Sequence, residues 1–404
     1  MTLIVQKFGG TSMAGPERIK HVAGRVVSMR KTGANVVAVV SAPGDMTDDL
    51  ITMARQITDQ PPARELDMLL ATGEQVAIAL LAMAIHAQGL DAISLTGAQA
   101  RIRTEPVHTR ARILDVDRGR IDRELAAGRI VIVAGFQGIT DDDEITTLGR
   151  GGSDTTAVAL ASALGADLCQ IYTDVEGVFT ADPRVVPGAR KLAEISYDEM
   201  LEMASSGALV VQTRAAELAK QFRVRLEVRS TFLDQEGTLV SDHAMERPRL
   251  VTGVTHDRNV AKITATGVGD RPGAAHTLFK ALADRHINVN MIIQSVPRKE
   301  KADISFTVAR GDMAAAVEAA RGVAKAIGAD DVLADDQVGM VSIVGAGMVS
   351  NPGVAARMFG ALAADRINIE LIATSEIKVS CVIRAGDLEK AVRALHKEFE
   401  LDRA

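Results

Sequence analysis

Ten residues, 147–156, combine the side chains and the backbone freedom that phosphate binding requires. They read Thr-Leu-Gly-Arg-Gly-Gly-Ser-Asp-Thr-Thr and directly precede Ala157–Leu164, an apolar stretch typical of a helix. Glycine has no Cβ atom, so the backbone N–H groups of such a loop can crowd around an anion. A helix that begins just behind the loop adds a partial positive charge. We therefore expect this loop to handle phosphate, with Arg150 able to pair with a carboxylate.

Ser153 and Asp154 also have a plainer interpretation. A serine at the start of a helix often caps it, and an aspartate at its opening complements the helix dipole. Capping leaves the three glycines around Arg150 unexplained. Both interpretations stay open for the two residues, whereas the loop as a whole favours phosphate binding.

Two further loops with glycine follow apolar runs typical of buried strands. Lys7-Phe-Gly-Gly-Thr-Ser12 follows the first run, and Ser41-Ala-Pro-Gly44, with Thr47 just beyond, follows the second. The first loop has neither the Walker nor the dinucleotide spacing, yet a lysine beside two glycines can hold its charge against phosphate oxygens. Ligands of α/β sheets bind beyond the carboxyl ends of strands. A tight turn with a surface lysine and an ordinary strand exit are the alternatives.

Two other segments contain acidic residues that could contact an amino-acid substrate or a nucleotide. Glu74 lies in Leu70–Ala87, for which we expect a helix that opens at Thr72 with a capping box. In the first turn of that helix a carboxylate either complements the dipole or provides a counter-charge for a substrate ammonium group. The segment Thr173–Arg184 mixes turn-forming residues, acids and an arginine, which predicts a loop that is compatible with nucleotide contact.

No pattern in the chain pairs a nucleophile with a base. The eight histidines are scattered, and none stands in a known order with a serine or a cysteine. An acceptor that is already a carboxylate, with a pKa of about 4, needs no such base at pH 7. Positioning and neutralisation of phosphate charge then suffice, and lysine, glycine loops, a helix N-terminus and Mg²⁺ provide them. The sequence favours this chemistry over redox or hydrolytic chemistry.

Composition places the chain among globular proteins and argues against several partners. Its 404 residues are 47% hydrophobic and 24% charged, which predicts two to three domains. The net charge of −6 and a pI near 5.8 argue against nucleic acid. Cys169 and Cys381 lie in apolar runs, which indicates buried thiols and no zinc site. The longest apolar stretch, Val76–Ile85, is too short for a bilayer and no secretory signal is evident, so we expect no membrane partner and a cytoplasmic location.

The first part of the chain alternates strand-like and helix-like segments. Buried strands are expected at Leu3–Phe8, Val36–Ser41, Ile130–Ala134 and Asp167–Tyr172. Strands that alternate with helices predict an α/β sandwich around a mostly parallel sheet.

After about residue 257 an internal repeat replaces this alternation. Residues 270–295 and 350–375 share a Pro-Gly pair, an Ile-Asn pair and a closing serine, all at an offset of 80. Each copy predicts a strand, a helix with proline in its first turn, two strands and a helix, which is the ferredoxin-like βαββαβ order. The first copy carries a longer hairpin, around Pro297–Ala302.

These motifs resemble a known family. The N-terminal half is similar to the amino acid kinase fold, an α/β/α sandwich. The combination of Lys7–Ser12, Thr147–Asp154 and Thr173–Arg184 resembles the aspartokinase family. The C-terminal repeat resembles the paired, ferredoxin-like ACT domains with which that family senses amino acids. The resemblance covers essentially the whole chain; the ten-residue loop and the Thr-Ala-Asp-Pro-Arg run are its specific parts.

The resemblance implies an activity. The γ-phosphoryl group of ATP, with Mg²⁺ held mainly by the nucleotide phosphates, would pass to the side-chain carboxylate of L-aspartate and give 4-phospho-L-aspartate, the first step toward lysine, threonine and methionine. Lys7 would bind the transferring phosphate, and Asp154 would organise the transfer. Glu74 would hold the aspartate ammonium group, and Arg150 its α-carboxylate. Further residues implied in the substrate site are Ser41, Thr47, Gly151, Gly152 and Ser153.

The resemblance also implies nucleotide and effector contacts, and it assigns no residue as a metal ligand. The implied nucleotide contacts are Lys7, Phe8, Gly9, Gly10, Thr173, Asp174, Phe179, Thr180, Ala181, Asp182, Pro183 and Arg184. The implied contacts to lysine and/or threonine as effectors are Asp270, Asn288, Val289, Asn290, Gln294, Asn368, Ile369, Ser375 and Glu376.

The expected domains are a kinase domain at 1–233, a linker at 234–256 and ACT domains at 257–339 and 340–404, and the two ACT domains are allowed to interleave. Because ACT sheets have edges and faces that seek partners, we expect at least a dimer. An internal start near Met245, which would give a separate regulatory chain, stays open.

Two residues depart from the family pattern. Leu209 stands where the family usually has a lysine near the nucleotide, and Asn290 stands where related ACT domains often have an aspartate. Two alternatives follow: another small-acid kinase of the same fold, for glutamate or acetylglutamate, or a non-catalytic amino-acid sensor or regulatory subunit. Retention of Lys7, Arg150 and Asp154 argues against the sensor.

Overall fold

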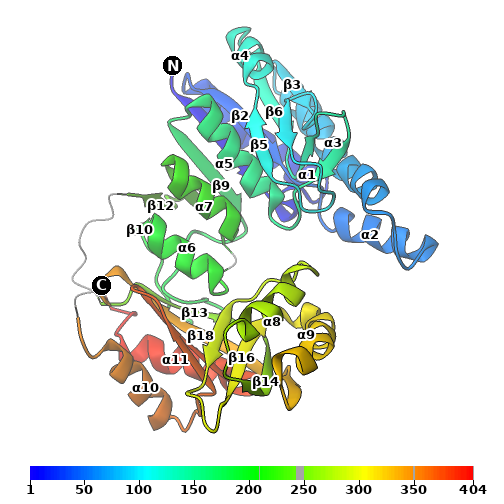
Figure 1. Cartoon of the computed structure of the whole chain (residues 1–404). Coiled ribbons are helices and arrows are strands. Elements are labelled where there is room, and N and C mark those ends of the chain that lie inside the picture. Colours follow the sequence, from blue (N-terminus) through cyan, green and yellow to red (C-terminus); the bar gives the residue numbers. More distant parts are fainter. Residues whose placement is uncertain (209, 243–249, 349–350, 404) are drawn as a thin grey trace. The chain divides into compact units, whose positions relative to one another are not determined.

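The computed structural model describes residues 1–208, 210–242, 250–348 and 351–403, and the chain divides into two compact units (Figure 1). The N-terminal unit comprises Met1–Val178, Lys191–Ala204 and Leu209–Met245. The C-terminal unit comprises Phe179–Arg190, Ser205–Ala208 and Glu246–Ala404. The C-terminal unit therefore includes two short segments that lie between parts of the N-terminal unit in the sequence. Leu209 and Met245, singled out from the sequence, lie outside the described residues.

An eight-stranded sheet in the order β10-β12-β11-β9-β1-β2-β6-β3 forms the centre of the N-terminal unit. Its strands are β1 (Leu3–Phe8), β2 (Asn35–Val40), β3 (Ala92–Leu95), β6 (Ile130–Ala134), β9 (Leu168–Thr173), β10 (Glu194–Ser196), β11 (Leu226–Ser230) and β12 (Thr238–Ser241). All neighbours are parallel except β11 and β12. Every residue of β6 is buried, as expected for a parallel strand covered on both faces. The predicted mostly parallel sheet is confirmed.

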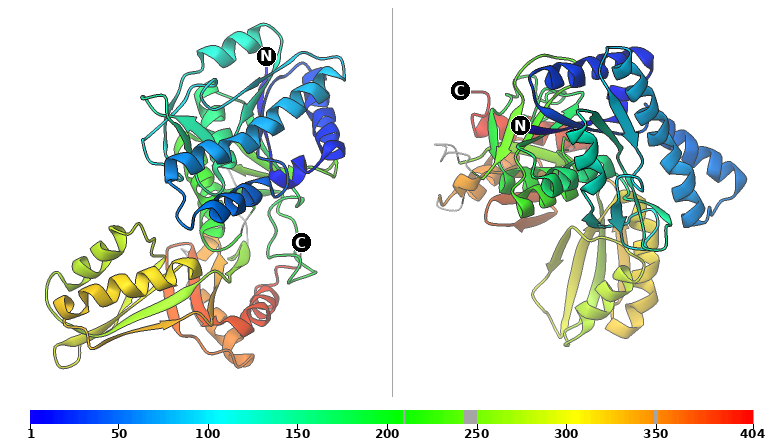
Figure 2. Two further views of the ribbon diagram at one scale, coloured as in Figure 1. Left: turned by 90° about the vertical axis from the view of Figure 1, so that its right-hand side faces the viewer. Right: turned by 90° about the horizontal axis from the view of Figure 1, so that it is seen from above.

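Helices cover both faces of this sheet (Figures 1 and 2). Helices α1 (Pro16–Lys31) and α3 (Ala63–His86) share one apolar core with alternate residues of β2 and β6, among them Val36, Ala38 and Val40. The intervening residues point to the opposite face because side chains alternate along a strand. The other helices of the unit are α2 (Met46–Ile57), α4 (Gly119–Ala126), α5 (Gly152–Leu164), α6 (Tyr197–Ser205) and α7 (Thr213–Phe222). Among them, α5 packs against β1 and β9, and α7 packs against α5.

Helix α3 begins earlier than the sequence suggested. It spans 24 residues and is, within the described ranges, the one helix long and apolar enough to cross a membrane by length and composition. It packs against the sheet instead, with Ala77, Leu81 and Ile85 fully buried in the shared core. The expected start at Thr72 is wrong, because Thr72 lies inside the helix and donates its hydroxyl to the Leu69 carbonyl.

A small four-stranded sheet, β5-β4-β7-β8, lies in the same unit and leads into the glycine loop. Its strands are β4 (Ile102–Thr104), β5 (Ile113–Val116), β7 (Gln137–Ile139) and β8 (Ile145–Thr147). Strand β8 packs against α3 and ends at Thr147. Of the ten residues 147–156, only 148–151 form a loop, because α5 begins at Gly152 and not at Ala157 as the apolar stretch suggested.

The C-terminal unit contains two ferredoxin-like modules, which confirms the predicted repeat. The first has strands in the order β15-β16-β14-β17, from β14 (Ala261–Gly269), α8 (Ala274–Ala283), β15 (Met291–Gln294), β16 (Lys301–Val308), α9 (Met313–Ile327) and β17 (Asp331–Asp335). The second has the order β13-β18-β20-β19, from β18 (Val338–Val344), α10 (Val354–Ala364), β19 (Leu371–Thr374), β20 (Lys378–Arg384) and α11 (Leu388–Glu398). Its edge strand β13 (Gly253–Asp257) precedes the first module in sequence.

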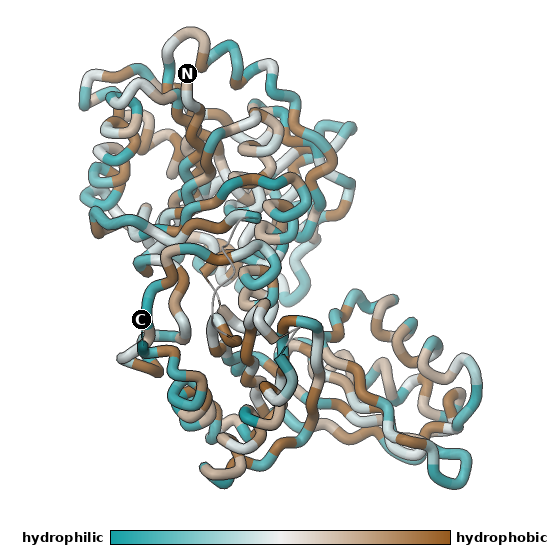
Figure 3. Tube along the Cα trace, turned by 90° about the vertical axis from the view of Figure 1, so that its left-hand side faces the viewer, coloured by the Kyte–Doolittle hydropathy of each residue, from teal (hydrophilic) through white to brown (hydrophobic). Residues whose placement is uncertain are grey.

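Two details of the repeat can be compared with expectation. Pro272 and Pro352 do not lie in the first helical turn; each precedes a glycine N-cap with a left-handed backbone, Gly273 and Gly353. Only a residue without Cβ adopts this conformation readily, so the Pro-Gly pair forms the turn before the helix. The longer first hairpin is confirmed, since residues 295–300 join β15 to β16 whereas 375–377 join β19 to β20. Figure 3 colours the trace by hydropathy, and brown, hydrophobic stretches occur in both units.

Candidate functional site

The carboxyl ends of neighbouring parallel strands place the predicted loops along one edge of the large sheet. Phe8 at the end of β1 pairs with Val40 on β2 and with Tyr172 on β9. A pocket of about 560 Å³ opens at this edge. Its lining includes these residues predicted from the sequence: Lys7, Ser41, Thr47, Glu74, Arg150, Gly151, Gly152, Ser153, Asp154 and Thr173. The structure thus brings together the whole predicted substrate set.

The glycine loop enters α5 through a left-handed residue. Gly151, with a φ angle of 74°, is the N-cap of α5, and a Cβ atom there would lie 1.9 Å from the side chain of Gln212. No side chain caps the helix, so the capping interpretation of Ser153 is wrong. The N–H of Gly152 donates to the Gly149 carbonyl at 3.0 Å and that of Thr155 to the Gly151 carbonyl at 3.3 Å, so the N–H groups of Ser153 and Asp154 are the ones that an anion at this helix start would take.

Lys7 and Asp154 form an ion pair inside the pocket. Lys7 Nζ lies 2.6 Å from Asp154 Oδ1, and the side chains are 13% and 8% exposed. Asp154 lies in the first turn of α5, and its Oδ2 also accepts the backbone N–H of Gln212 at 3.3 Å. This aspartate therefore connects β1, α5 and the start of α7.

Glu74 is buried in the middle of α3, so the explanation by a helix dipole is wrong. Its Oε1 accepts the N–H of Ala42 at 3.0 Å, just beyond β2. Its Oε2 is buried and has no hydrogen-bond partner among the described residues. Burial raises the pKa of this carboxyl group to about 7. A cationic ligand group in the pocket would stabilise its charged form.

Arg150 has the opposite environment. Its side chain is exposed at the edge of the pocket and makes no hydrogen bond or ion pair within the described ranges. Ser41 and Thr47 add hydroxyl groups to the same lining. The pocket therefore combines one buried acid with one free guanidinium.

Several predicted nucleotide residues do not line this pocket. Phe8 is fully buried and stacks on Tyr172 at 4.6 Å between ring centroids. Gly9, Gly10 and Asp174 are also outside the lining. The remaining predicted contacts, Phe179, Thr180, Ala181, Asp182, Pro183 and Arg184, belong to the C-terminal unit.

In the C-terminal unit, the segment Phe179–Arg190 is held by buried contacts. Thr180 is fully buried, and its hydroxyl lies 3.0 Å from Nε2 of His396 on α11. Ala181, with Val185 and Val186, packs into the apolar core of the second module. Burial lowers the pKa of His396, which favours its neutral form. The segment is therefore a structural part of this unit.

Sequence reasoning missed a buried acid beside the pocket. Asp67 is fully buried and accepts hydrogen bonds from the Thr147 hydroxyl at 2.5 Å and from the Thr109 N–H at 3.0 Å. Its Oδ2 also lies 2.9 Å from His108 Nδ1. Thr109 and Gln212 line the pocket as well. No local motif marks Asp67, because its partners lie 41 to 80 positions away in the chain.

The predicted effector residues lie at corresponding places in the two modules. Asn288, Val289 and Asn290 connect α8 to β15, and Asn368 and Ile369 connect α10 to β19. Strands β15 and β19 lie side by side. Gln294 ends β15, Ser375 and Glu376 follow β19, and Asp270 follows β14; all four are exposed.

Comparison with known proteins identifies the family. Residues 2–230 match the amino acid kinase family, and residues 263–322 and 341–399 match an ACT domain. An aspartate kinase of Stutzerimonas stutzeri is 52% identical over 405 residues, 100% of this chain and 98% of that protein. The aspartokinase of Mycolicibacterium smegmatis is 51% identical over 407 residues, 99% of this chain and 97% of that protein. The chain belongs to the aspartokinase family.

Solved structures agree with this membership of the aspartokinase family. E. coli aspartokinase III in complex with aspartate and ADP has a TM-score of 0.82 at 24% identity, over 98% of this chain and 99% of that one. The same protein in complex with lysine and aspartate has a TM-score of 0.75 at 25% identity, with the same coverage. The fold and the family expected from the motifs are confirmed, and the protein is a kinase.

Proposed function

We propose that this enzyme transfers the γ-phosphoryl group of ATP to the side-chain carboxylate of L-aspartate and forms 4-phospho-L-aspartate. The observation that carries the proposal is the unpartnered Oε2 of Glu74, buried beside a pocket that also contains the free guanidinium of Arg150. A buried charge is costly until a partner satisfies it. An α-amino acid brings an ammonium group for Glu74 and a carboxylate for Arg150, which leaves its side-chain carboxylate to react.

The chemistry requires little of the protein beyond charge and position. The acceptor carboxylate is ionised at pH 7 and needs no base. In our proposal Lys7 moves from Asp154 to the transferring phosphoryl group, and the N-terminus of α5 adds its partial positive charge. Asp154 holds Lys7 ready before the nucleotide arrives. Gly151 and Gly152 let backbone N–H groups approach the phosphate closely.

The remaining parts of the proposal concern Mg²⁺ and the nucleotide. No group of three metal-ligating side chains exists among the described residues, and the carboxylate of Asp154 is engaged by Lys7. We therefore assign Mg²⁺ to the nucleotide phosphates, where it would neutralise their charge. Thr173 at the end of β9 and the segment Phe179–Arg184 are assigned to ATP.

We further propose the biological setting that the family suggests. The reaction would open the route to lysine, threonine and methionine in the cytoplasm. Lysine and/or threonine would bind where β15 and β19 lie side by side and inhibit the enzyme, and the chain would assemble at least as a dimer. A lysine complex of E. coli aspartokinase III supports the choice of lysine.

The test is hydroxamate formation by purified protein with ATP, Mg²⁺, hydroxylamine and either aspartate or glutamate. We expect aspartyl hydroxamate, lowered by added lysine or threonine, and its loss in Glu74→Gln. Product with glutamate and none with aspartate would establish a different small-acid kinase. Lysine or threonine binding by calorimetry without any turnover would establish a sensor.

A further inference from the structure

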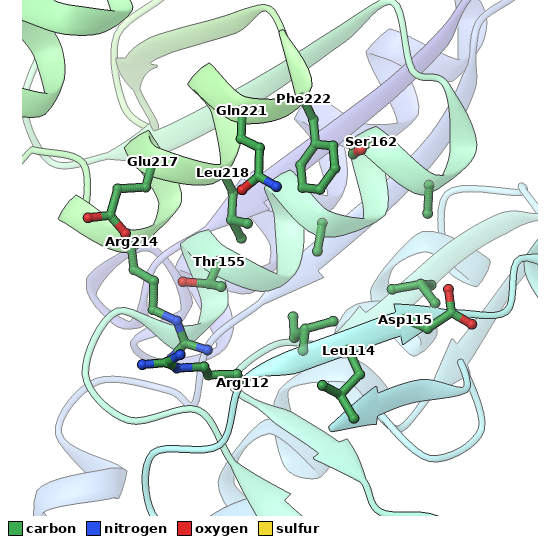
Figure 4. A pocket seen from close by; sticks show the side chains of 14 residues that line it. Arg112, Leu114, Asp115, Thr155, Ser162, Arg214, Glu217, Leu218, Gln221 and Phe222 are labelled. Atoms are coloured by element: carbon green, nitrogen blue, oxygen red, sulfur yellow. The ribbon is translucent and has the colours of Figure 1, made fainter. Parts of the chain in front are cut away.

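A second pocket lies on the other side of α5 from the proposed substrate site. Its volume is about 770 Å³, and its walls are α5, α7 and β5 (Figure 4). Helix α5 contributes Ser153 and Asp154 to the first pocket and Thr155 and Ser162 to the second. One helix therefore separates two cavities that are both large enough for a small molecule.

The second pocket has an apolar side. Ile113, Leu114 and Val116 line it from β5, and Leu218 and Phe222 line it from α7. Leu114 is 59% exposed and Phe222 is 51% exposed, although both are large apolar side chains. Apolar surface of this kind inside a concavity favours a ligand with an apolar part.

Two guanidinium groups lie together at one end of this pocket. Arg112 and Arg214 extend from opposite walls and bring their guanidinium groups next to each other (Figure 4). Burial and then the charge of Arg112 lower the pKa of Arg214. Arg112 is 79% exposed and pairs with Glu105, whose Oε1 lies 3.9 Å from its Nε and accepts its backbone N–H at 3.1 Å. Glu105 and Glu217, the latter in the pocket lining, offset part of the charge on Arg214, and burial together with Arg112 outweighs them. Two cations held this close favour an anion between them.

Arg214 connects this pocket to the proposed phosphoryl-transfer loop. Its guanidinium donates to the carbonyl of Leu148 at 2.9 Å and to that of Ala111 at 2.7 Å. Leu148 directly precedes Gly149, Arg150 and the two glycines at the start of α5. Two residues before Arg214, the N–H of Gln212 donates to Asp154. The start of α7 therefore contacts Asp154 of the first pocket through Gln212, and it places Arg214 in the second pocket.

We propose that the second pocket binds a small organic anion that carries an apolar group. The anionic head lies between Arg112 and Arg214, and the apolar group lies against Leu114 and Phe222. An anion that attracts the guanidinium of Arg214 weakens its hydrogen bond to the Leu148 carbonyl. Because Leu148 precedes the glycine loop, an occupied pocket alters phosphoryl transfer. The binding site is inferred from the pocket lining and the two adjacent guanidinium groups alone, whereas its effect on catalysis rests on the proposed function.

Titration calorimetry of the full chain with four probes tests the site. Octanoate and octyl phosphate carry an anionic head and an apolar tail, 1-octanol has the tail alone, and acetate has the head alone. We expect saturable binding of at least one of the two amphipathic anions, with octanol and acetate about tenfold weaker or worse, because a charge-assisted hydrogen bond is lost or the apolar contact is absent. The tighter of the two anions identifies a carboxylate or a phosphate head.

Variants locate the binding. Arg112→Gln and Leu114→Ser are expected to weaken binding of the tighter of the two amphipathic anions about tenfold, since each removes one of the two contacts. Arg101→Gln is the matched control, because Arg101 is an exposed arginine paired with Asp117 and does not line the pocket. Unchanged affinity of the tighter anion in Arg112→Gln, or octanol that binds as well as the tighter anion, would overturn the site. If the anion binds only at protein concentrations low enough to dissociate an oligomer, the pocket is an interface between copies of the chain. That result would also overturn the proposed site.

The hydroxamate assay tests the coupling. The tighter of the two amphipathic anions is expected to change the KM for aspartate or kcat in the wild type, and to leave both unchanged in Arg112→Gln, whose activity without that anion stays normal. Identical kinetics with and without a saturating concentration of that anion would overturn the coupling. The protein could bind the anion, with loss of affinity in Arg112→Gln, and yet form no hydroxamate. That result would contradict the proposed function but would still support the binding site.

Discussion

Lys7 and Asp154 form the ion pair that joins the end of β1 to the first turn of α5, with 2.6 Å between Nζ and Oδ1. Both side chains are almost fully shielded from water, so each charge depends on the other. In the proposed reaction Lys7 exchanges Asp154 for phosphate oxygens. The pair therefore keeps a buried cation in position before the nucleotide binds, and it makes the two residues interdependent.

A double-mutant cycle on this pair tests that interdependence. Asp154→Asn and Lys7→Met are each expected to lower kcat roughly 100-fold or more, since each removes charge stabilisation or its positioning. Each is also expected to lower the free energy of unfolding by on the order of 3 kcal/mol, because one buried charge is left alone. The double variant should regain stability without activity. The measurements are hydroxamate formation and urea unfolding, and near-normal kcat in Asp154→Asn would remove this residue from the mechanism.

The buried Glu74 predicts a dependence of stability on pH. Its folded-state pKa of about 7 lies above the ordinary value of 4.5, so between these values the folded chain holds a proton that the unfolded chain has released. The free energy of unfolding therefore falls as pH rises through this range, by on the order of 3 kcal/mol in total. Glu74→Gln should remove this fall and be more stable than the wild type at pH 8. Urea unfolding at pH 5 and pH 8 measures it, and parallel pH profiles of the two proteins would contradict it.

The same residue predicts proton release when aspartate binds. An ammonium group beside Oε2 stabilises the charged carboxylate, so binding near pH 6 expels the proton of Glu74. Calorimetry in two buffers of different ionisation enthalpy should show this release in the wild type and not in Glu74→Gln. The KM for aspartate should fall as pH rises through about 7. A wild type that binds aspartate without releasing protons would count against the assigned role.

Much of this arrangement could be predicted from the sequence, for physical reasons. Apolar runs predict buried parallel strands, and the carboxyl ends of such strands share one edge, so Lys7, Ser41 and Thr173 converge there. The glycine loop reaches the same place from β8 of the small sheet, which the strand pattern did not predict. The site residues that could not be predicted are those held by contacts between residues far apart in the sequence. Asp67 fastens Thr147 from a position 80 residues away, and no local pattern reports such a bond.

The first residues of two helices, α3 and α5, were also predicted wrongly from the sequence. Thr72 resembles a cap, yet α3 begins at Ala63 because the residues before Thr72 are also good helix formers. Ser153 likewise resembles a cap, but the left-handed Gly151 takes that place. In both cases the residue type was compatible with a cap, and the backbone conformation of its neighbours decided the outcome.

Gly151 and Gly165 provide a matched pair at the two ends of α5. Both have left-handed backbones, with φ angles of 74° and 65°, but a Cβ atom at Gly151 would meet Gln212 whereas nothing lies within 4 Å of one at Gly165. Alanine at either position should cost about 1 kcal/mol of stability from backbone strain. Only Gly151→Ala should also lose hydroxamate formation, since Gln212 and the loop must shift. Equal kcat values in the two variants would show that the loop tolerates the displacement.

The contact between Thr180 and His396 yields the last prediction. Thr180 Oγ1 accepts the N–H of Arg190 and lies 3.0 Å from His396 Nε2, so its own proton is available for the neutral imidazole. The segment that contains Thr180 is assigned to ATP, yet its anchor is on α11. Loss of this bond should therefore loosen the nucleotide segment without touching the aspartate residues.

We expect Thr180→Val and His396→Phe each to raise the KM for ATP severalfold while the KM for aspartate stays unchanged. Thr180→Val keeps the size of the side chain, so a matching effect in the two variants identifies the hydrogen bond rather than the packing as the cause. Arg393→Gln, on the same helix but half-exposed and paired with Glu389, is the control and should behave as the wild type. An equal rise in both KM values would mean that the substitutions disturb the fold generally, and normal kinetics in both would show that the anchor does not position ATP.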